Sequence, residues 1–271
     1  MARQNNHSRE LTEFFLLSFL IAWAVWIPIL LGLLPAALVP FGFLGPIVAA
    51  TTLTARNSGK AGLKSLYAGL LRFKVSWVWY IAILTPAAIT TVTHLVFSFF
   101  FGFESFIGLD KIVISYLVIA VFLILEEVGW RGYALPRLLN GHSALKASLI
   151  LGVVWAVWHF PFWSIIPIAG APEPFFLFYI TGTMGAVCMA VVLTWIYKNT
   201  GRSIALATLC HASFNATVGA ITFDKSVAIY HNLILVVVAV LVAVLLVAIF
   251  GGKDLRRSRS GDDLDMVGAA N

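Results

Sequence analysis

The sequence predicts an all-α protein, a polytopic membrane bundle of about eight transmembrane helices with both termini in the cytoplasm. Hydrophobic residues make up 61% of the 271 positions and charged residues 11%, whereas soluble domains average about 45–50% and about 25%. The apolar residues form continuous runs, unlike the alternation that is typical of a membrane β-barrel. The net charge of +6 is better explained by basic loops that set membrane topology than by nucleic-acid binding.

The apolar runs define the expected spans in chain order. The first run is too long for a signal-peptide core and predicts an uncleaved anchor. The second is short and broken by Pro46, and the basic segment 56–74 after it has leucines at the spacing of an amphipathic surface helix. The remaining six runs are each long enough to be read as a membrane span. The expected spans are residues 11–34, 41–55, 77–101, 112–130, 147–163, 175–197, 203–223 and 228–250.

The basic residues support this number of spans. Eight spans place 16 of the 18 Lys and Arg residues on one side, with only Lys111 and Lys225 on the other. By the positive-inside rule that side is the cytoplasm. We therefore expect residues 1–250 to form one integral, multi-pass domain in a plasma membrane, with short loops that suit a prokaryote. Residues 251–271 are polar and predict a disordered cytoplasmic tail.

Ionisable residues within membrane spans are costly and are therefore candidate functional groups. Glu126 and Glu127 end the fourth apolar run, and Arg131 lies one helical turn after Glu127. An acid four residues before a base is the favourable orientation for an ion pair on a helix. One interpretation is an exposed ion pair at a helix end. The other interpretation is that Glu127 and Arg131 form a structural ion pair, which leaves Glu126 free to take part in catalysis.

Two other spans carry histidines with a polar or aromatic neighbour at helical spacing. Trp155 precedes His159 by four residues, and His211 precedes Asn215 by four. Each pair alone is compatible with ordinary packing or with hydrogen bonds between membrane helices. Counting about 1.5 Å per residue from the nearest cytoplasmic charge puts Glu126, His159 and His211 at about the same depth. A carboxylate, two imidazoles and an amide at one buried level can activate water and bind an oxyanion.

These motifs resemble those of the CAAX-protease and bacteriocin-processing family of intramembrane proteases, which includes the Ras-converting CAAX endopeptidase. The resemblance rests on Glu-Glu-x-x-x-Arg, aromatic-x-x-x-His and His-x-x-x-Asn, in this order on separate spans, and covers about residues 113–223. Trp155 stands where the family usually has Phe. The resemblance implies a protease core over 113–223 and carries over six functional residues: Glu126, Glu127, Arg131, His159, His211 and Asn215.

The expected chemistry is hydrolysis of a peptide bond by an activated water. Glu126 serves as general base with help from His159, and His211 and Asn215 donate to the developing oxyanion. Glu127, Arg131 and Trp155 support the site. A zinc ion held by Glu126, His159 and His211 is the alternative, because two His and one Glu can form a catalytic zinc shell. We favour a reaction that needs no cofactor.

Two other functions remain open at this point. Buried acids and histidines can line the ion or proton path of a transporter, although no inverted repeat is visible in the sequence. The second alternative function is a non-catalytic scaffold that retains the site as a relic, although no residue of the three motifs is missing. The expected partners are a peptide or protein substrate in or near the membrane and the lipid bilayer, with no nucleic acid. The sequence leaves the substrate's identity and the oligomeric state open.

Overall fold

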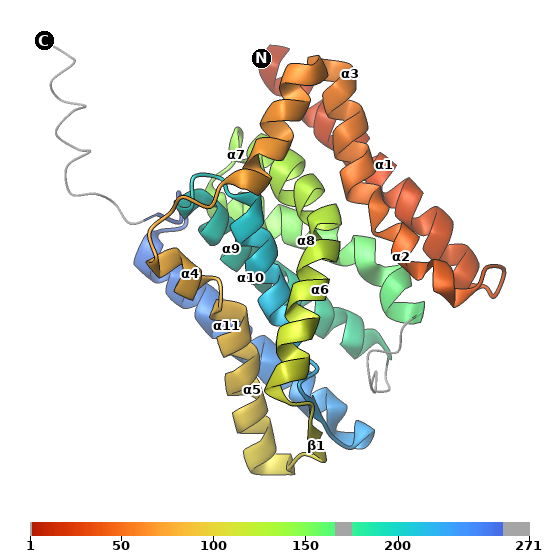
Figure 1. Ribbon diagram of the computed structural model, residues 1–271, viewed down its shortest axis with the longest axis vertical. Helices are drawn as coiled ribbons and strands as arrows, with labels where there is room; N and C mark the ends of the chain where they lie inside the picture. The colour runs from red at the N-terminus through yellow and green to blue at the C-terminus, as the bar shows by residue number, and fades with distance from the viewer. Residues whose placement is uncertain (1, 166–174, 257–271) are drawn as a thin grey trace, which may run out of the picture.

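The computed structural model describes residues 2–165 and 175–256, and it confirms the all-α membrane bundle (Figure 1). Within these residues the only strands are two short ones, β1 (Ser105–Phe106) and β2 (Ile221–Thr222), which pair antiparallel. Short 3₁₀ turns occupy Ala36–Leu38, Gly69–Leu71 and Lys225–Val227. The helices are α1 (Ala2–Leu30), α2 (Val39–Gly42), α3 (Leu44–Ala68), α4 (Val78–Ala82), α5 (Thr85–Phe101), α6 (Leu109–Glu127), a π-helical segment η3 (Val128–Ala134), α7 (Leu135–Leu139), α8 (Ala144–Ile165), α9 (Phe175–Asn199), α10 (Ile204–Thr217) and α11 (Ala228–Phe250).

Seven helical segments of the described chain are long and apolar enough to cross a membrane. The eighth expected span, 203–223, corresponds to α10, which has only 14 residues and is about 21 Å long at 1.5 Å per residue. It packs against α5, α6 and α9, and Figure 1 shows it in the middle of the bundle. Because protein rather than lipid surrounds most of α10, its length is not set by the thickness of the hydrocarbon core.

The second expected span is interrupted close to Pro46, as the sequence predicted. The break falls at Phe43, between α2 and α3, and the proline lies in the first turn of α3, where its missing N–H would be unpaired in any residue. The span is longer than expected, because α3 runs on to Gly59, where φ is +56°, a backbone conformation that favours glycine. There the chain turns back (Figure 1), and the basic segment continues as a second helical arm of α3.

The loops expected on the two sides of the membrane are grouped at opposite ends of the bundle. At one end, β1 joins the α5–α6 connection to the segment after α10. At the other, Ala144 N–H donates to Lys253 C=O at 2.8 Å and Arg137 donates to Glu10 at 2.8 Å. The N-terminal part of α1 and the chain after α11 therefore lie on the same side. Leu255 is buried there, whereas residues 257–271 of the predicted tail lie outside the described residues.

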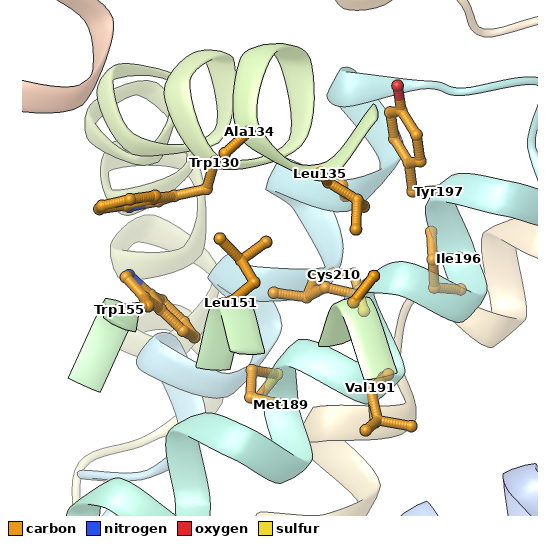
Figure 2. Packing of buried hydrophobic residues seen from close by; sticks show 14 of the residues in the cluster. Trp130, Ala134, Leu135, Leu151, Trp155, Met189, Val191, Ile196, Tyr197 and Cys210 are labelled. Atoms are coloured by element: carbon orange, nitrogen blue, oxygen red, sulfur yellow. The ribbon is translucent and has the colours of Figure 1, made fainter. Parts of the chain in front are cut away.

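The apolar core runs through the middle of the bundle and surrounds the polar residues considered below. In Figure 2, Trp130 and Trp155 lie at one side of this cluster, with Leu151 and Cys210 toward its middle. Cys188 and Cys210 are both buried and free. Large apolar side chains are exposed on the outer faces of α5, α6 and α11, as expected for helix faces that contact lipid.

The absolute orientation can be tested with Gly141→Cys and Gly219→Cys, because both glycines are exposed and a Cβ there would meet no atom within 4 Å. We expect a membrane-impermeant maleimide to label position 219 in intact cells and position 141 only after permeabilisation. The parent chain is the control, since its two cysteines are buried. Labelling in the opposite pattern would place the termini outside the cell.

Candidate active site

Three packed elements bring the sequence-predicted residues to one buried region. Glu126 and Glu127 are the last two residues of α6, and Arg131 follows within the π-helical segment η3. Trp155 and His159 lie one turn apart on α8, and His211 lies on α10. The two glutamates and Arg131 are at most 2% exposed. The interpretation of an exposed ion pair at a helix end is therefore wrong, because the helix continues to Leu139 and both acids stay inside the bundle.

One carboxylate oxygen of Glu127 connects α6, η3 and α10. Its Oε1 accepts a hydrogen bond from Arg131 Nη1 at 2.8 Å and one from His211 Nδ1 at 2.9 Å. Buried charges that are paired and hydrogen-bonded avoid most of the cost of burial. Arg131 Nε and Nη2 have no hydrogen-bond partner among the described residues, but the guanidinium lies 4.8 Å from the Trp155 ring centroid, which is a cation–π distance.

The π-helical segment places Arg131 and its neighbours at an unusual register. Between Glu127 and Arg131, Gly129 packs directly on Pro46 of α3, and a Cβ at this glycine would lie 2.4 Å from the Pro46 Cβ. Only glycine permits this approach of the two helices. Single π-helical turns occur frequently at functional sites. The close contact fixes the end of α6, which carries both glutamates, against α3.

Glu126 has no partner on its own helix, as expected, but it has two on α8. Its Oε2 accepts a hydrogen bond from Trp155 Nε1 at 2.9 Å and lies 3.9 Å from His159 Nε2. His159 Nδ1 lies 2.9 Å from the Trp155 carbonyl oxygen. A carbonyl oxygen only accepts, so Nδ1 carries the proton and a neutral His159 presents the Nε2 lone pair to Glu126. Two hydrogen-bond acceptors therefore face each other across a gap that is too long for a direct hydrogen bond.

Trp155 contacts four of the polar residues of the site. Besides its hydrogen bond to Glu126 and its stacking under Arg131, it meets His159 and His211 edge-on, with ring centroids 5.5 and 5.0 Å apart. The sequence had suggested only an aromatic contact to His159. A phenylalanine has no N–H to donate, so the tryptophan at this position adds a hydrogen bond to Glu126 that the usual family residue cannot make.

Two further aromatic residues were not identified from the sequence. Trp163 stacks on His159 with centroids 5.5 Å apart and an interplanar angle of 11°, and Trp158 meets the same ring edge-on at 4.6 Å. The signal for Trp163 was its position four residues after His159, on the same helix face. These rings limit how far the imidazole can rotate.

Asn215 lies one turn after His211 on α10 and is half-buried. Its side chain makes no hydrogen bond to any residue in the described part of the chain. Its two amide protons are therefore available to a ligand. The structure gives no direct contact of Asn215 with Glu126 or His159.

One feature of this site is typical of metal-binding sites, and another is not. Each histidine donates its Nδ1–H to an oxygen, His159 to a carbonyl and His211 to a carboxylate, which is the outer-shell pattern of metal-bound histidines. Among the described residues, however, no three His, Cys, Asp or Glu side chains are grouped closely enough to hold a metal ion. Glu126, His159 and His211 therefore do not form a ready three-ligand shell in this arrangement.

Comparison with known proteins gives the same assignment as the motifs. Residues 108–217 match the model of the family described as type II CAAX prenyl endopeptidase Rce1-like. All six residues carried over by the resemblance lie within this segment. Over this segment the chain is similar to the Rce1-like endopeptidases. A curated relative from Methanococcus maripaludis, CAAX prenyl protease 2, is 27% identical over 217 residues, which cover 74% of this chain and 79% of that protein.

The expected class of the protein is thereby confirmed. It is an intramembrane endopeptidase and an integral, multi-pass membrane protein. The comparisons favour this assignment over a transporter. They imply a protein or peptide substrate at the membrane. The buried Glu127–Arg131 pair and the Trp155 hydrogen bond each lead to a measurable expectation for this protein.

Arg131→Ala should strongly destabilise the protein, because it leaves the Glu127 carboxylate buried without its counter-charge. Breaking a buried ion pair typically costs about 3–5 kcal/mol. Arg9→Ala is the matched control, because Arg9 pairs with Glu13 at the same i, i+4 spacing but is 78% exposed, and exposed pairs contribute about 0–1 kcal/mol. Unfolding of both purified variants in detergent measures the difference. Equal stability would mean that Arg131 does not compensate Glu127.

Trp155→Phe should lower the turnover rate more than it lowers stability, because the ring remains while the hydrogen bond to Glu126 is lost. Hydrogen bonds to charged groups contribute about 1.5–3 kcal/mol, so we expect a fall of roughly tenfold to a hundredfold. Trp26→Phe is the control, because Trp26 is also fully buried and donates to a backbone carbonyl, that of Val39. A similar loss of activity in both variants would assign Trp155 a packing role alone.

Proposed function

We propose that the protein cleaves a peptide bond with a water molecule activated between Glu126 and His159. The observation that supports this most directly is the 3.9 Å separation of Glu126 Oε2 and His159 Nε2, because both atoms are acceptors when the imidazole is neutral. A water molecule between them would donate one hydrogen to each. It would then be oriented and ready to lose a proton to a general base.

The reaction would proceed through a tetrahedral intermediate. As the water oxygen attacks the carbonyl carbon, its proton passes to Glu126, and the carbonyl oxygen becomes an oxyanion. Glu126 then returns a proton to the leaving nitrogen as the C–N bond breaks, which releases a carboxylic acid and an amine. His159 keeps the water on the correct side of Glu126, and Trp155 holds the carboxylate through its N–H.

The oxyanion would be stabilised from α10. The unused amide protons of Asn215 are suitable donors. His211 Nδ1 is occupied by Glu127, so His211 can donate from Nε2 only when the ring carries both protons. The Glu127 carboxylate is placed to balance the resulting positive charge, and this gives the Glu127–His211 hydrogen bond a role in the reaction as well as in the fold.

The proposed substrate is a polypeptide segment presented at the membrane. The Methanococcus relative is named as a prenyl protease, and a prenylated cysteine near the cleaved bond is one chemistry that would bring a peptide to the bilayer. The exposed apolar surface of the bundle is compatible with substrates that are anchored in the bilayer.

Glu126→Gln should abolish cleavage without reducing the yield of folded protein. The amide oxygen can still accept the Trp155 hydrogen bond, but the group can no longer take a proton from water, and general base catalysis typically contributes about 10²–10⁴-fold. New peptide termini in membranes that express the wild-type protein should disappear with the variant. Near-full activity of Glu126→Gln together with an inactive, folded Glu127→Gln would exchange the roles of the two acids.

We further propose that the reaction depends on the glutamate and requires no metal. Purified protein should then retain activity after exhaustive chelation and contain no stoichiometric metal. If zinc is present in equimolar amount, and if chelation removes activity that added zinc restores, Glu126, His159 and His211 must rearrange to bind it. That result would replace the general-base role of Glu126 with a ligand role.

A further inference from the structure

A second polar cavity lies at the end of the bundle that carries the chain termini. Its volume is about 270 Å³, and its wall is formed by α3, η3, α7 and the adjoining ends of α9 and α10. Glu126, His159 and His211 do not contribute to this wall. The cavity is therefore separate from the candidate active site, although Tyr133 in its wall lies only two residues after Arg131.

Positive charge dominates the cavity. Three arginines line it and no acidic residue does. Arg137 is already paired with Glu10. Arg72 donates to the backbone carbonyl of Gly201 at 2.6 Å, and neither Arg72 nor Arg202 forms an ion pair with any described residue. Two cationic side chains at the cavity are thus without a counter-charge from the described protein.

The other polar groups of the wall are suited to an anion. Hydroxyl groups of Ser58, Ser65 and Tyr197 line the cavity, and Figure 2 shows the Tyr197 hydroxyl pointing away from the apolar cluster. Tyr133 is fully buried, and its hydroxyl has no hydrogen-bond partner among the described residues. Guanidinium and hydroxyl donors together are the groups that bind phosphate oxygens.

The surroundings of Arg72 indicate where that phosphate would come from. Leu71, Phe73 and Trp77 are 81%, 47% and 70% exposed, which is a pattern of apolar and aromatic side chains that anchors proteins at the level of lipid headgroups. Residues 56–74 contain five basic and no acidic side chains. Basic pockets between transmembrane helices are recognised headgroup sites, and free phosphate would gain nothing from the exposed apolar residues beside this one.

We propose that this cavity binds the phosphate headgroup of an anionic phospholipid through Arg72, Arg202 and the Tyr197 hydroxyl. The lipid would connect the second arm of α3 to η3 and to the start of α10, two of the elements that carry the active-site residues. Binding to the folded state alone stabilises that state. The proposal concerns binding only and is independent of the catalytic mechanism.

The test compares two double variants of the full chain in detergent. Arg72→Gln/Arg202→Gln removes both unpaired charges and leaves a polar side chain at each position. Lys60→Gln/Lys64→Gln removes the same charge from exposed positions on α3 that do not line the cavity. Native mass spectrometry measures the affinity of each for dioleoyl-phosphatidylglycerol, with dioleoyl-phosphatidylcholine and inorganic phosphate as the other ligands, and thermal unfolding without lipid checks the fold.

We expect the wild-type protein to bind one phosphatidylglycerol in preference to phosphatidylcholine. At about 1 kcal/mol for each basic residue near a lipid surface, the arginine variant should bind roughly thirty-fold more weakly, and the lysine variant should bind nearly as the wild type. If the arginine variant is unfolded, Tyr197→Phe replaces it and should also weaken binding. Equal affinity in the arginine and lysine variants overturns the site, and phosphate binding as tight as that of the lipid assigns it to a soluble anion.

Discussion

The arrangement of this protein depends on one carboxylate oxygen that is shared by two donors in the buried interior of the bundle. Glu127 Oε1 accepts from Arg131 in the π-helical segment and from His211 on α10. Removing any one of the three leaves a charge or a polar group buried without compensation. Because the three residues come from both sides of the α6–α10 contact, the same interaction that balances the charges also fixes the position of the two helices that carry the site.

The need to keep these charged residues buried and paired explains other features of the bundle. The α6–η3 helix continues past both glutamates instead of ending there, so the acids stay inside the protein. α10 can be short because other helices enclose it, and Gly129 lets Pro46 of α3 pack against the turn between Glu127 and Arg131. Each feature would be costly in an exposed lipid-facing helix, and each is tolerated here because neighbouring helices satisfy the backbone and exclude lipid.

Much of this could be predicted from the sequence, because hydropathy and basic residues are strong signals in membrane proteins. The helical class, seven of the eight expected spans and the proximity of Glu126 to His159 all followed from apolar runs and residue counting. The turn at Gly59 and the π-helical segment did not, because both depend on local backbone geometry within a continuous run. The Trp155 hydrogen bond and the Glu127–His211 bond were also missed, since contacts between helices leave no periodic pattern in a single chain.

The two histidines are alike in sequence context but differ in what holds them. His159 donates to a neutral backbone carbonyl on its own helix, so its other nitrogen can remain an acceptor for water. His211 donates to a carboxylate, which can balance a positive charge on the ring and so allow its other nitrogen to become a donor. A reaction that removes a proton at one point and stabilises negative charge at another can use one histidine of each kind. The difference is therefore compatible with the proposed reaction, in which Glu126 of α6 and His159 of α8 activate the water and α10 supplies the donors to the oxyanion.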